Sequence, residues 1–189
     1  MEELSLQPYL VIFHNVLSDL EIQQLERMSR THRKRPTVFR VQTQDRLVDF
    51  IRTGEGAWLL PKTAKDTDRL ITDRIERRIG VFTGFKTSWP KLHQFLNYRF
   101  GGVFLPHWDF FNAKTGFMYG ERLATLKKVE YGGATIFPNL KIAVPPIKCS
   151  ALFWMSINRD NHDYEFNTLR CGCPEIAGNK FGQLYYVVC

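Results

Sequence analysis

The sequence predicts an α+β domain that is mainly β, with helices in its first half and short antiparallel strands in its second. Two stretches before residue 90 repeat apolar side chains at helical spacing, and five short β-type runs separated by Gly and Pro follow residue 91. The length of 189 residues fits one domain. We therefore expect a single domain over 1–189, with a helical front over 1–90 and a β-sandwich or barrel over 91–189.

The first helix is expected to begin at Ser18. The Ser18 hydroxyl can accept from the backbone N–H of Glu21 while the Glu21 carboxylate reaches back, which is a capping box. A second helix is expected over 66–79, and Gly80 or Gly84 is expected to end it. Its apolar stripe is formed by Leu70, Ile71, Ile75 and Ile79.

The strands of the second half are expected where β-branched and aromatic residues gather between turn residues. Even spacing of such short runs is typical of an antiparallel sandwich or barrel. The expected strands are Val103–Leu105, Ala134–Phe137, Lys141–Val144, Ala151–Trp154 and Gly182–Val188.

The composition excludes several classes of protein. Hydrophobic residues make up 44% of the chain and aromatic residues 14%, which is too much apolar material for a disordered chain. No apolar run approaches the roughly 18 residues of a membrane-spanning helix, and residues 1–5 lack the features of a secretory signal. The net charge of +7 allows nucleic acid as a partner, but the densest basic cluster, Arg30–Arg35, has no aromatic residue. We expect no nucleic-acid partner and no membrane span.

The cysteines give little support to a zinc site. Cys171 and Cys173 are separated by one residue instead of the two typical of a zinc knuckle, and no second His/Cys cluster complements them. With Cys149 and Cys189 they allow three disulfide pairings, among which the sequence does not choose.

The segment that carries chemistry is His107-Trp108-Asp109. In His-x-Asp on a strand, both side chains lie on one face, so an imidazole and a carboxylate can reach one metal ion. With a distant third ligand, this makes the facial triad of non-haem Fe(II) oxygenases. Taken alone, the pattern also fits a His at a strand end that is hydrogen-bonded to a neighbour.

The wider pattern is more specific, because motifs along nearly the whole chain recur in order. They are Pro8-Tyr9, Gly56–Leu59, Asn97–Phe110, Ala124–Leu126, Gly132–Pro138, Ala151–Trp154, Cys171–Pro174 and Gly178–Lys180. With these motifs the chain resembles the catalytic domain of the prolyl 4-hydroxylase α-subunit. The resemblance implies a double-stranded β-helix (jelly roll) with N-terminal helices packed on one sheet. It also implies procollagen-proline 4-dioxygenase-like activity on peptidyl proline with Fe(II), O₂, 2-oxoglutarate and ascorbate.

The resemblance assigns roles to five residues. His107 and Asp109 match two iron ligands, and Lys180 matches the lysine that binds the far carboxylate of 2-oxoglutarate. Tyr98 and Thr125 match residues of the cosubstrate pocket, although a core Tyr and a strand Thr remain alternatives for them. Where the family has a tryptophan six residues after the lysine, this chain has Tyr186.

The third iron ligand of the family is absent. Arg170 stands at its position, and a guanidinium stays protonated and offers no lone pair to a metal. At about 4 Å and an effective dielectric constant near 20, it would repel Fe²⁺ by roughly 8 kcal/mol before screening. His162 could replace the ligand only if the chain shifted by several residues, and an exposed loop His is the simpler interpretation. We therefore expect weak activity or none.

Other departures from the family pattern also favour weak activity or none. The segment 126–130 is several residues shorter than in the family and places Lys127 and Lys128 where buried residues are expected, so we expect a distorted sheet or a shifted register. A non-catalytic family member that serves as a peptide-binding or subunit-pairing module is the alternative function. The family further implies the endoplasmic reticulum lumen, collagen-like peptides and protein disulfide isomerase as a partner.

Overall fold

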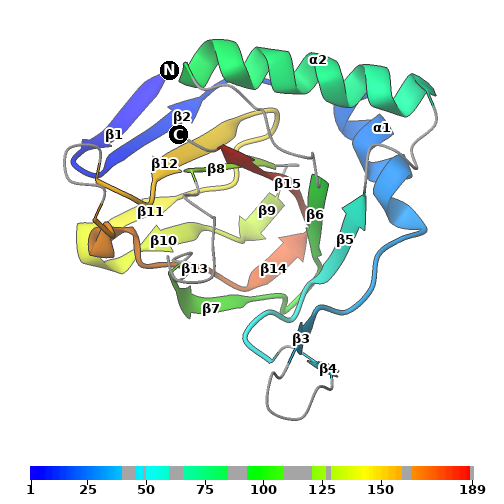
Figure 1. Cartoon of the computed structure of the whole chain (residues 1–189). Helices are drawn as coiled ribbons and strands as arrows, with labels where there is room; N and C mark the ends of the chain where they lie inside the picture. Colours follow the sequence, from blue (N-terminus) through cyan, green and yellow to red (C-terminus); the bar gives the residue numbers. More distant parts are fainter. Residues whose placement is uncertain are drawn as a thin grey trace.

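Strands dominate the computed structural model, which describes residues 1–39, 46–48, 50–59, 66–84, 93–108, 121–126, 129–158 and 163–187 (Figure 1). In chain order the elements are β1 (Glu2–Leu6), β2 (Tyr9–Phe13), α1 (Asp19–Arg30), β3 (Thr37–Phe39), β4 (Arg46–Val48), β5 (Glu55–Leu59), α2 (Asp66–Thr83), β6 (His93–Tyr98), β7 (Phe104–His107), β8 (Glu121–Leu126), β9 (Val129–Gly132), β10 (Thr135–Phe137), η3 (Pro138–Leu140), β11 (Ile142–Val144), β12 (Ala151–Met155), η4 (Phe166–Thr168), β13 (Arg170–Gly172), β14 (Glu175–Gly178) and β15 (Lys180–Val187). The predicted mainly β fold with two α-helices is confirmed for this part of the chain.

The strands form two larger antiparallel sheets. One has seven strands in the order β1-β2-β12-β8-β15-β6-β5, and the other has four in the order β11-β10-β13-β7. The pairs β14-β9 and β3-β4 stand apart. In Figure 1, α1 and α2 lie beyond one face of the seven-stranded sheet, and the four-stranded sheet lies beyond the other.

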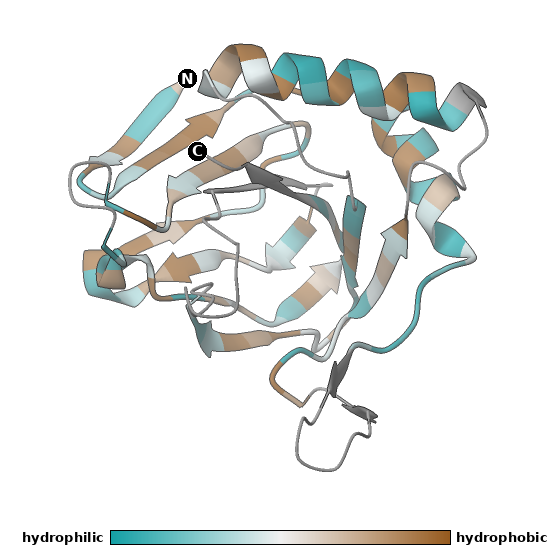
Figure 2. Ribbon diagram, viewed as in Figure 1, coloured by the Kyte–Doolittle hydropathy of each residue, from teal (hydrophilic) through white to brown (hydrophobic). Residues whose placement is uncertain are grey.

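The side chains of β2 and β12 alternate between two cores. Successive residues of a strand point to opposite faces, so each strand contributes to both layers. The core between the two sheets contains Leu10, Ile12, Leu152 and Trp154. The core under the helices contains Val11, Phe13, Ala151 and Phe153. Both strands are therefore buried on two faces. Figure 2 shows the hydrophobic colour of β2.

Helix α1 begins with the predicted capping box. The backbone N–H of Glu21 donates to Ser18 Oγ at 3.3 Å, and that of Ser18 donates to Glu21 Oε2 at 2.8 Å. Arg78 of α2 donates to both carboxylate oxygens of Glu21 at 2.9 Å, which ties the two helices together. At the other end, Arg33 donates to the Glu26 carbonyl and to Ser29 Oγ, so one member of the basic cluster satisfies the last turn of the helix.

Helix α2 agrees with the predicted stripe except at one position. Ile71, Ile75 and Ile79 are buried, but Leu70 is 62% exposed and lies outside the core. Gly80 lies within the helix, and Gly84, with φ of +77°, follows its end. Of the two glycines expected to stop the helix, Gly84 is the one that does so. None of the helices in the described part of the chain is long and apolar enough to cross a membrane.

The prediction of a helical front over 1–90 is incomplete. Strands β1, β2 and β5 also come from this half, and all three belong to the seven-stranded sheet. The run Tyr9–Phe13 is apolar at every position because both of its faces are buried, so it lacks the alternation that marks a half-buried strand. The five strands expected after residue 91 are all present, each within two residues of its expected bounds.

The shortened segment does not disturb the centre of the sheet. Strand β8 pairs with β12 and with β15 in uninterrupted register, so the expected distortion is absent there. An irregular register occurs between β9 and β14, where it shifts twice, and β9 begins inside the shortened segment at Val129. Lys127 and Lys128 lie outside the described residues.

Candidate functional site

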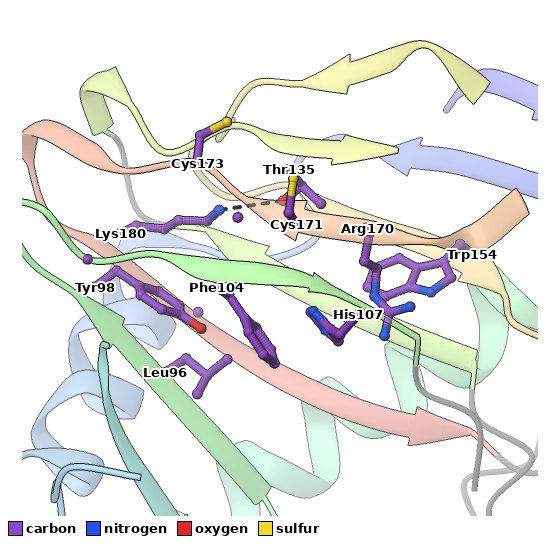
Figure 3. Close-up of a pocket in the computed structure, with 13 residues that line it drawn as sticks. Leu96, Tyr98, Phe104, His107, Thr135, Trp154, Arg170, Cys171, Cys173 and Lys180 are labelled. Atoms are coloured by element: carbon purple, nitrogen blue, oxygen red, sulfur yellow. Dashed lines mark hydrogen bonds between the residues drawn. The ribbon is translucent and has the colours of Figure 1, made fainter. Parts of the chain in front are cut away.

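A pocket opens between the two larger sheets and is lined by residues of six strands (Figure 3). Four of the residues singled out by the sequence line it, namely Tyr98, His107, Arg170 and Lys180. The rest of the lining is formed by Leu96, Gly102, Phe104, Thr135, Trp154, Cys171, Gly172, Cys173 and Gly182. The folding of β6, β7, β13 and β15 therefore brings together side chains from distant parts of the sequence.

Lys180 extends into one end of the pocket from the start of β15. It is 8% exposed. Its ammonium donates to the Gly133 carbonyl at 2.5 Å and to Thr135 Oγ1 at 3.4 Å. In the sheet it lies directly opposite Tyr98 of β6, whose side chain is 7% exposed. Burial lowers the pKa of Lys180, and the nearby Glu175 carboxyl opposes this effect.

Glu175 is a buried acid beside this lysine. It is 1% exposed, and neither of its carboxylate oxygens has a hydrogen-bond partner among the described residues. Burial raises its pKa to about 7, although the Lys180 ammonium acts in the opposite direction. A Cβ built on Gly133 would clash with Glu175 Oε1, so the carboxyl packs against the backbone that accepts from Lys180.

His107 stands at the end of β7, on the other side of the pocket. Its Nδ1 lies 2.8 Å from the Leu105 carbonyl, and its ring stacks on Phe104 with centroids 3.6 Å apart. Across the β7-β13 pairing, His107 is the partner of Arg170. Directly opposed residues of an antiparallel pair have Cβ atoms about 5 Å apart, so the side chains of Arg170 and His107 start close together.

Arg170 is held in this position by two neighbours. Only 2% of it is exposed, its Nη1 donates to the Thr168 carbonyl at 3.1 Å, and its guanidinium carbon lies 4.9 Å from the centroid of the Trp154 ring. Trp154 comes from the core between the sheets. A guanidinium on an aromatic face gains cation–π attraction and keeps its N–H groups in the plane of the group.

These residues do not fit the iron that the resemblance implies. Arg170 can only donate hydrogen bonds, and it places a fixed positive charge next to His107. Within the described ranges, no three His, Cys, Asp or Glu side chains are grouped so that they could hold a metal ion. The predicted ligand Asp109 and the alternative His162 lie outside these ranges.

The remaining predicted positions lie on the central strands of the large sheet. Thr125 lies on β8 in register with Ala151 and Gln183, whereas Gly182, which lines the pocket, pairs with Leu126. The pocket role of Thr125 stays a prediction. Tyr186 lies on β15, in register with Arg122 of β8.

The described cysteines are free thiols. Cys171 and Cys173 line the pocket, while Cys149 lies near the start of α1 and donates to Asp19 Oδ1 at 3.4 Å. Burial raises the pKa of Cys171, which keeps its thiol protonated at neutral pH. Cys189 lies outside the described residues.

Sequence reasoning missed four contributors to the site. Thr135 and Gly133 belong to a quoted motif, but no pattern in the sequence indicates that they bind the Lys180 ammonium. The strand pattern around Trp154 gives no sign of its contact with Arg170. Glu175 carries no local signal, because an acid at the start of a short strand is usually exposed to solvent.

Comparison with known proteins gives one consistent group of relatives. The chain is 35% identical over 190 residues to prolyl 4-hydroxylase subunit alpha-2 of Caenorhabditis elegans and 32% identical over 192 residues to subunit alpha-3 of Homo sapiens. These alignments cover 96% and 95% of this chain but 34% of each relative. The chain thus spans about a third of the length of the relatives it matches. No family model matches it.

Solved structures share the fold. The viral collagen prolyl hydroxylase of Paramecium Bursaria Chlorella virus-1, in its 2OG complex, superposes with a TM-score of 0.70 at 19% identity and covers 94% of both chains. A prolyl-4-hydroxylase of Pseudomonas putida superposes with a TM-score of 0.59 at 12% identity, covering 94% of this chain and 91% of its own. The chain is thus similar in sequence to the prolyl 4-hydroxylase alpha subunits over about a third of their length, and the solved structures show a shared fold.

Proposed function

We propose that residues 1–189 act as a single jelly-roll domain of the prolyl 4-hydroxylase type that binds 2-oxoglutarate and whose hydroxylation of peptidyl proline is impaired by Arg170. The observation that carries the proposal is the buried Lys180 ammonium in a pocket between the sheets. The buried Glu175 carboxyl attracts this ammonium, and a ligand carboxylate can add charge-assisted hydrogen bonds to it.

The pocket supports this role for Lys180. Thr135 Oγ1 lies 3.4 Å from its ammonium and can add a hydroxyl contact to a bound carboxylate. The apolar side chains of Leu96 and Phe104 line the same pocket, and an environment of low dielectric constant strengthens the attraction between ammonium and carboxylate. The proposed cosubstrate therefore fits the residues present.

The wider functional setting is also part of the proposal. The substrate would be a proline-containing, collagen-like peptide, Fe(II) and ascorbate would be the metal and reductant, and protein disulfide isomerase in the endoplasmic reticulum lumen would be the partner. The names of the sequence relatives support a proline-containing substrate, and the other points are what the resemblance implies.

Iron binding is the step that we expect to be weak. Arg170 is buried directly across from His107, so a metal bound there would meet a fixed positive charge in place of a ligand. The same observation favours one alternative function, a non-catalytic member that keeps the pocket and serves as a peptide-binding or subunit-pairing module. The alternative predicts no turnover under any iron concentration.

Anaerobic titration with Fe(II) and 2-oxoglutarate tests the proposal. A 2-oxo acid chelated to Fe(II) gives a visible charge-transfer band, which we expect to be weak or absent in the natural chain and restored in Arg170→His. Arg99→His is the matched control, because the Arg99 side chain is 72% exposed and is absent from the pocket lining. Absence of the band in Arg170→His, with its fold intact by circular dichroism, would contradict the assignment of this position.

Succinate release separates the two functions. If Arg170→His releases succinate with a proline-rich peptide while the natural chain releases a small but measurable amount, the chain is an impaired enzyme. If the natural chain releases none while the variant does, the non-catalytic alternative holds.

A further inference from the structure

A buried acid lies beside the lysine of the pocket. Glu175 begins β14 and is 1% exposed, and neither of its carboxylate oxygens has a hydrogen-bond partner among the described residues. Glu175 is absent from the described lining of the pocket, whereas Lys180 belongs to it. Glu175 can therefore act on a ligand only through the charge of Lys180, which it attracts.

The acid and the lysine meet at one glycine. Lys180 donates to the Gly133 carbonyl and to Thr135, toward which its side chain points in Figure 3. The Glu175 carboxyl packs against the same glycine, because a Cβ built on Gly133 would clash with both carboxylate oxygens. The two charged groups are thus separated only by a short stretch of buried backbone, where the effective dielectric constant is low.

The backbone around Glu175 keeps its carboxyl inside the protein. The N–H of Gly101 donates to the Glu175 carbonyl at 2.8 Å, and the N–H of Glu175 donates to the Gly102 carbonyl at 3.3 Å. Glu175 is also paired with Gly132 of β9. Because this backbone is held by two neighbouring segments, the buried carboxyl responds to a change in nearby charge by gaining or losing a proton and not by moving into water.

A ligand carboxylate on Lys180 is such a change in charge. The Lys180 ammonium favours the ionised form of Glu175, yet burial still raises the pKa of Glu175 to about 7, so both forms are populated near neutral pH. When a carboxylate binds the ammonium, two acids share one buried cation, and each disfavours the ionised form of the other. A bound carboxylate therefore raises the pKa of Glu175 further.

The other titratable or charged side chains on the elements around this pair either lie at the surface or belong to the pocket. The surface groups are Arg99, which pairs with Glu55, and Glu130 and Tyr131 of β9; the pocket groups are Tyr98, His107, Arg170, Cys171 and Cys173. All of them are unchanged in a Glu175 variant, so their contributions cancel when that variant is compared with the natural chain.

We propose that Glu175 is a positioning residue for the pocket, which takes up a proton when a carboxylate ligand binds the Lys180 ammonium. The proposal rests on the proposed function for the ligand on Lys180 and deepens it by making ligand binding dependent on pH. The affinity for 2-oxoglutarate should be highest while Glu175 is neutral, because the ionised acid repels the ligand carboxylate. By reciprocity, the bound ligand draws a proton onto Glu175.

Isothermal titration of the full chain with 2-oxoglutarate tests the proposal. The titrations are run in EDTA and, under anaerobic conditions, with Fe(II). At pH 7.5, a comparison of HEPES and Tris buffers, which differ in ionisation enthalpy, should show uptake of about half a proton for each ligand bound. Between pH 6 and pH 8 the affinity should fall by about five-fold or more.

A conservative variant identifies the group that takes up the proton. Glu175→Gln keeps the shape of the neutral acid, so it should lose this proton uptake, and its affinity at pH 8 should stay near that of the natural chain at pH 6. The matched control is Glu130→Gln, at an exposed position of the neighbouring β9, which should keep the natural pH profile. Infrared difference spectra locate the proton: at pH 8 the ligand should increase the carbonyl band of a protonated carboxylic acid in the natural chain but not in Glu175→Gln.

The outcomes separate this inference from the proposed function. Equal proton uptake in Glu175→Gln and the natural chain, or identical pH profiles of affinity, overturns the role of Glu175 but leaves the 2-oxoglutarate pocket. Absence of 2-oxoglutarate binding both in EDTA and with Fe(II) overturns the proposed function and this inference together. Binding that Lys180→Met does not weaken also overturns both, because the ligand would then lie elsewhere.

Discussion

Replacing Glu175 by Gln should make the protein more stable at alkaline pH. The Glu175 carboxyl is 1% exposed, has no hydrogen-bond partner for either oxygen among the described residues, and has its pKa raised by burial from 4.5 to about 7. The folded chain therefore holds a proton that the unfolded chain releases between these two pH values. Stability supplied by the neutral acid is present at low pH and is lost as the pH rises toward 7.

The size of the effect follows from the distance between the two pKa values. A pKa raised from 4.5 to about 7, at about 1.4 kcal/mol for each pH unit, corresponds to a loss on the order of 3 kcal/mol above pH 7. Glutamine has nearly the same shape and no charge, so its folded state does not carry this loss. The difference in unfolding free energy between Glu175→Gln and the natural chain should grow by about this amount from pH 5 to pH 8.

Urea denaturation at several pH values between 5 and 8 measures this difference, and groups common to both chains cancel in it. The control is Glu130→Gln on β9, the strand that pairs with β14, because Glu130 is exposed to solvent. Its difference from the natural chain should stay constant. In a Lys180→Met background, the cation that opposes the rise in the pKa of Glu175 is absent. The stability difference that Glu175→Gln makes should then grow more between pH 5 and pH 8. A Glu175→Gln difference that does not change with pH would refute the reasoning that the buried acid lacks compensation.

Two further predictions concern the surroundings of this acid and the link between the helices. Gly133→Ala should destabilise the fold by about 2 kcal/mol more than Gly84→Ala. Both glycines have positive φ, but of the two only a Cβ at position 133 would clash, against Glu175 Oε1. Thermal unfolding measures the two losses of stability, and equal losses would contradict the prediction. Arg78→Met should cost about 2 kcal/mol at pH 7 by leaving Glu21 unpaired. Burial raises the pKa of Glu21, but the hydrogen bonds from Arg78 and Ser18 outweigh this effect and hold the pKa below 4.5. The stability lost in Arg78→Met should therefore shrink as the pH falls below 4.5. A loss that persists at pH 3 would show that the pair acts through packing.

Local patterns predicted much of the fold. The capping box at Ser18 and Glu21 is present as expected, because it depends only on residues three apart. The five strands after residue 91 are also where turn residues and β-branched runs place them. Strand β2 was missed because its two-sided burial depends on β12, whose residues lie about 140 positions further along the chain. No pattern within Tyr9–Phe13 indicates that β12 is its partner strand.

In the candidate site, too, some features follow from the sequence and others depend on contacts between distant strands. The resemblance places His107 and Arg170 at two iron-ligand positions of the family, and the two residues are paired across β7 and β13. The stacking of Arg170 on Trp154 and the burial of Glu175 could not be predicted, because each depends on how separate strands meet in space. The roles of Asp109 and Thr125 stay predictions.

The position of β15 between β8 and β6 also has a consequence for synthesis. Because the strand that joins the two parts of the large sheet comes from residues 180–187, β8 and β6 present unpaired edges until the ribosome has released that segment. The nascent chain must therefore be shielded from self-association while residues 1–179 are already made, and we expect chaperone dependence to fall sharply once β15 has emerged.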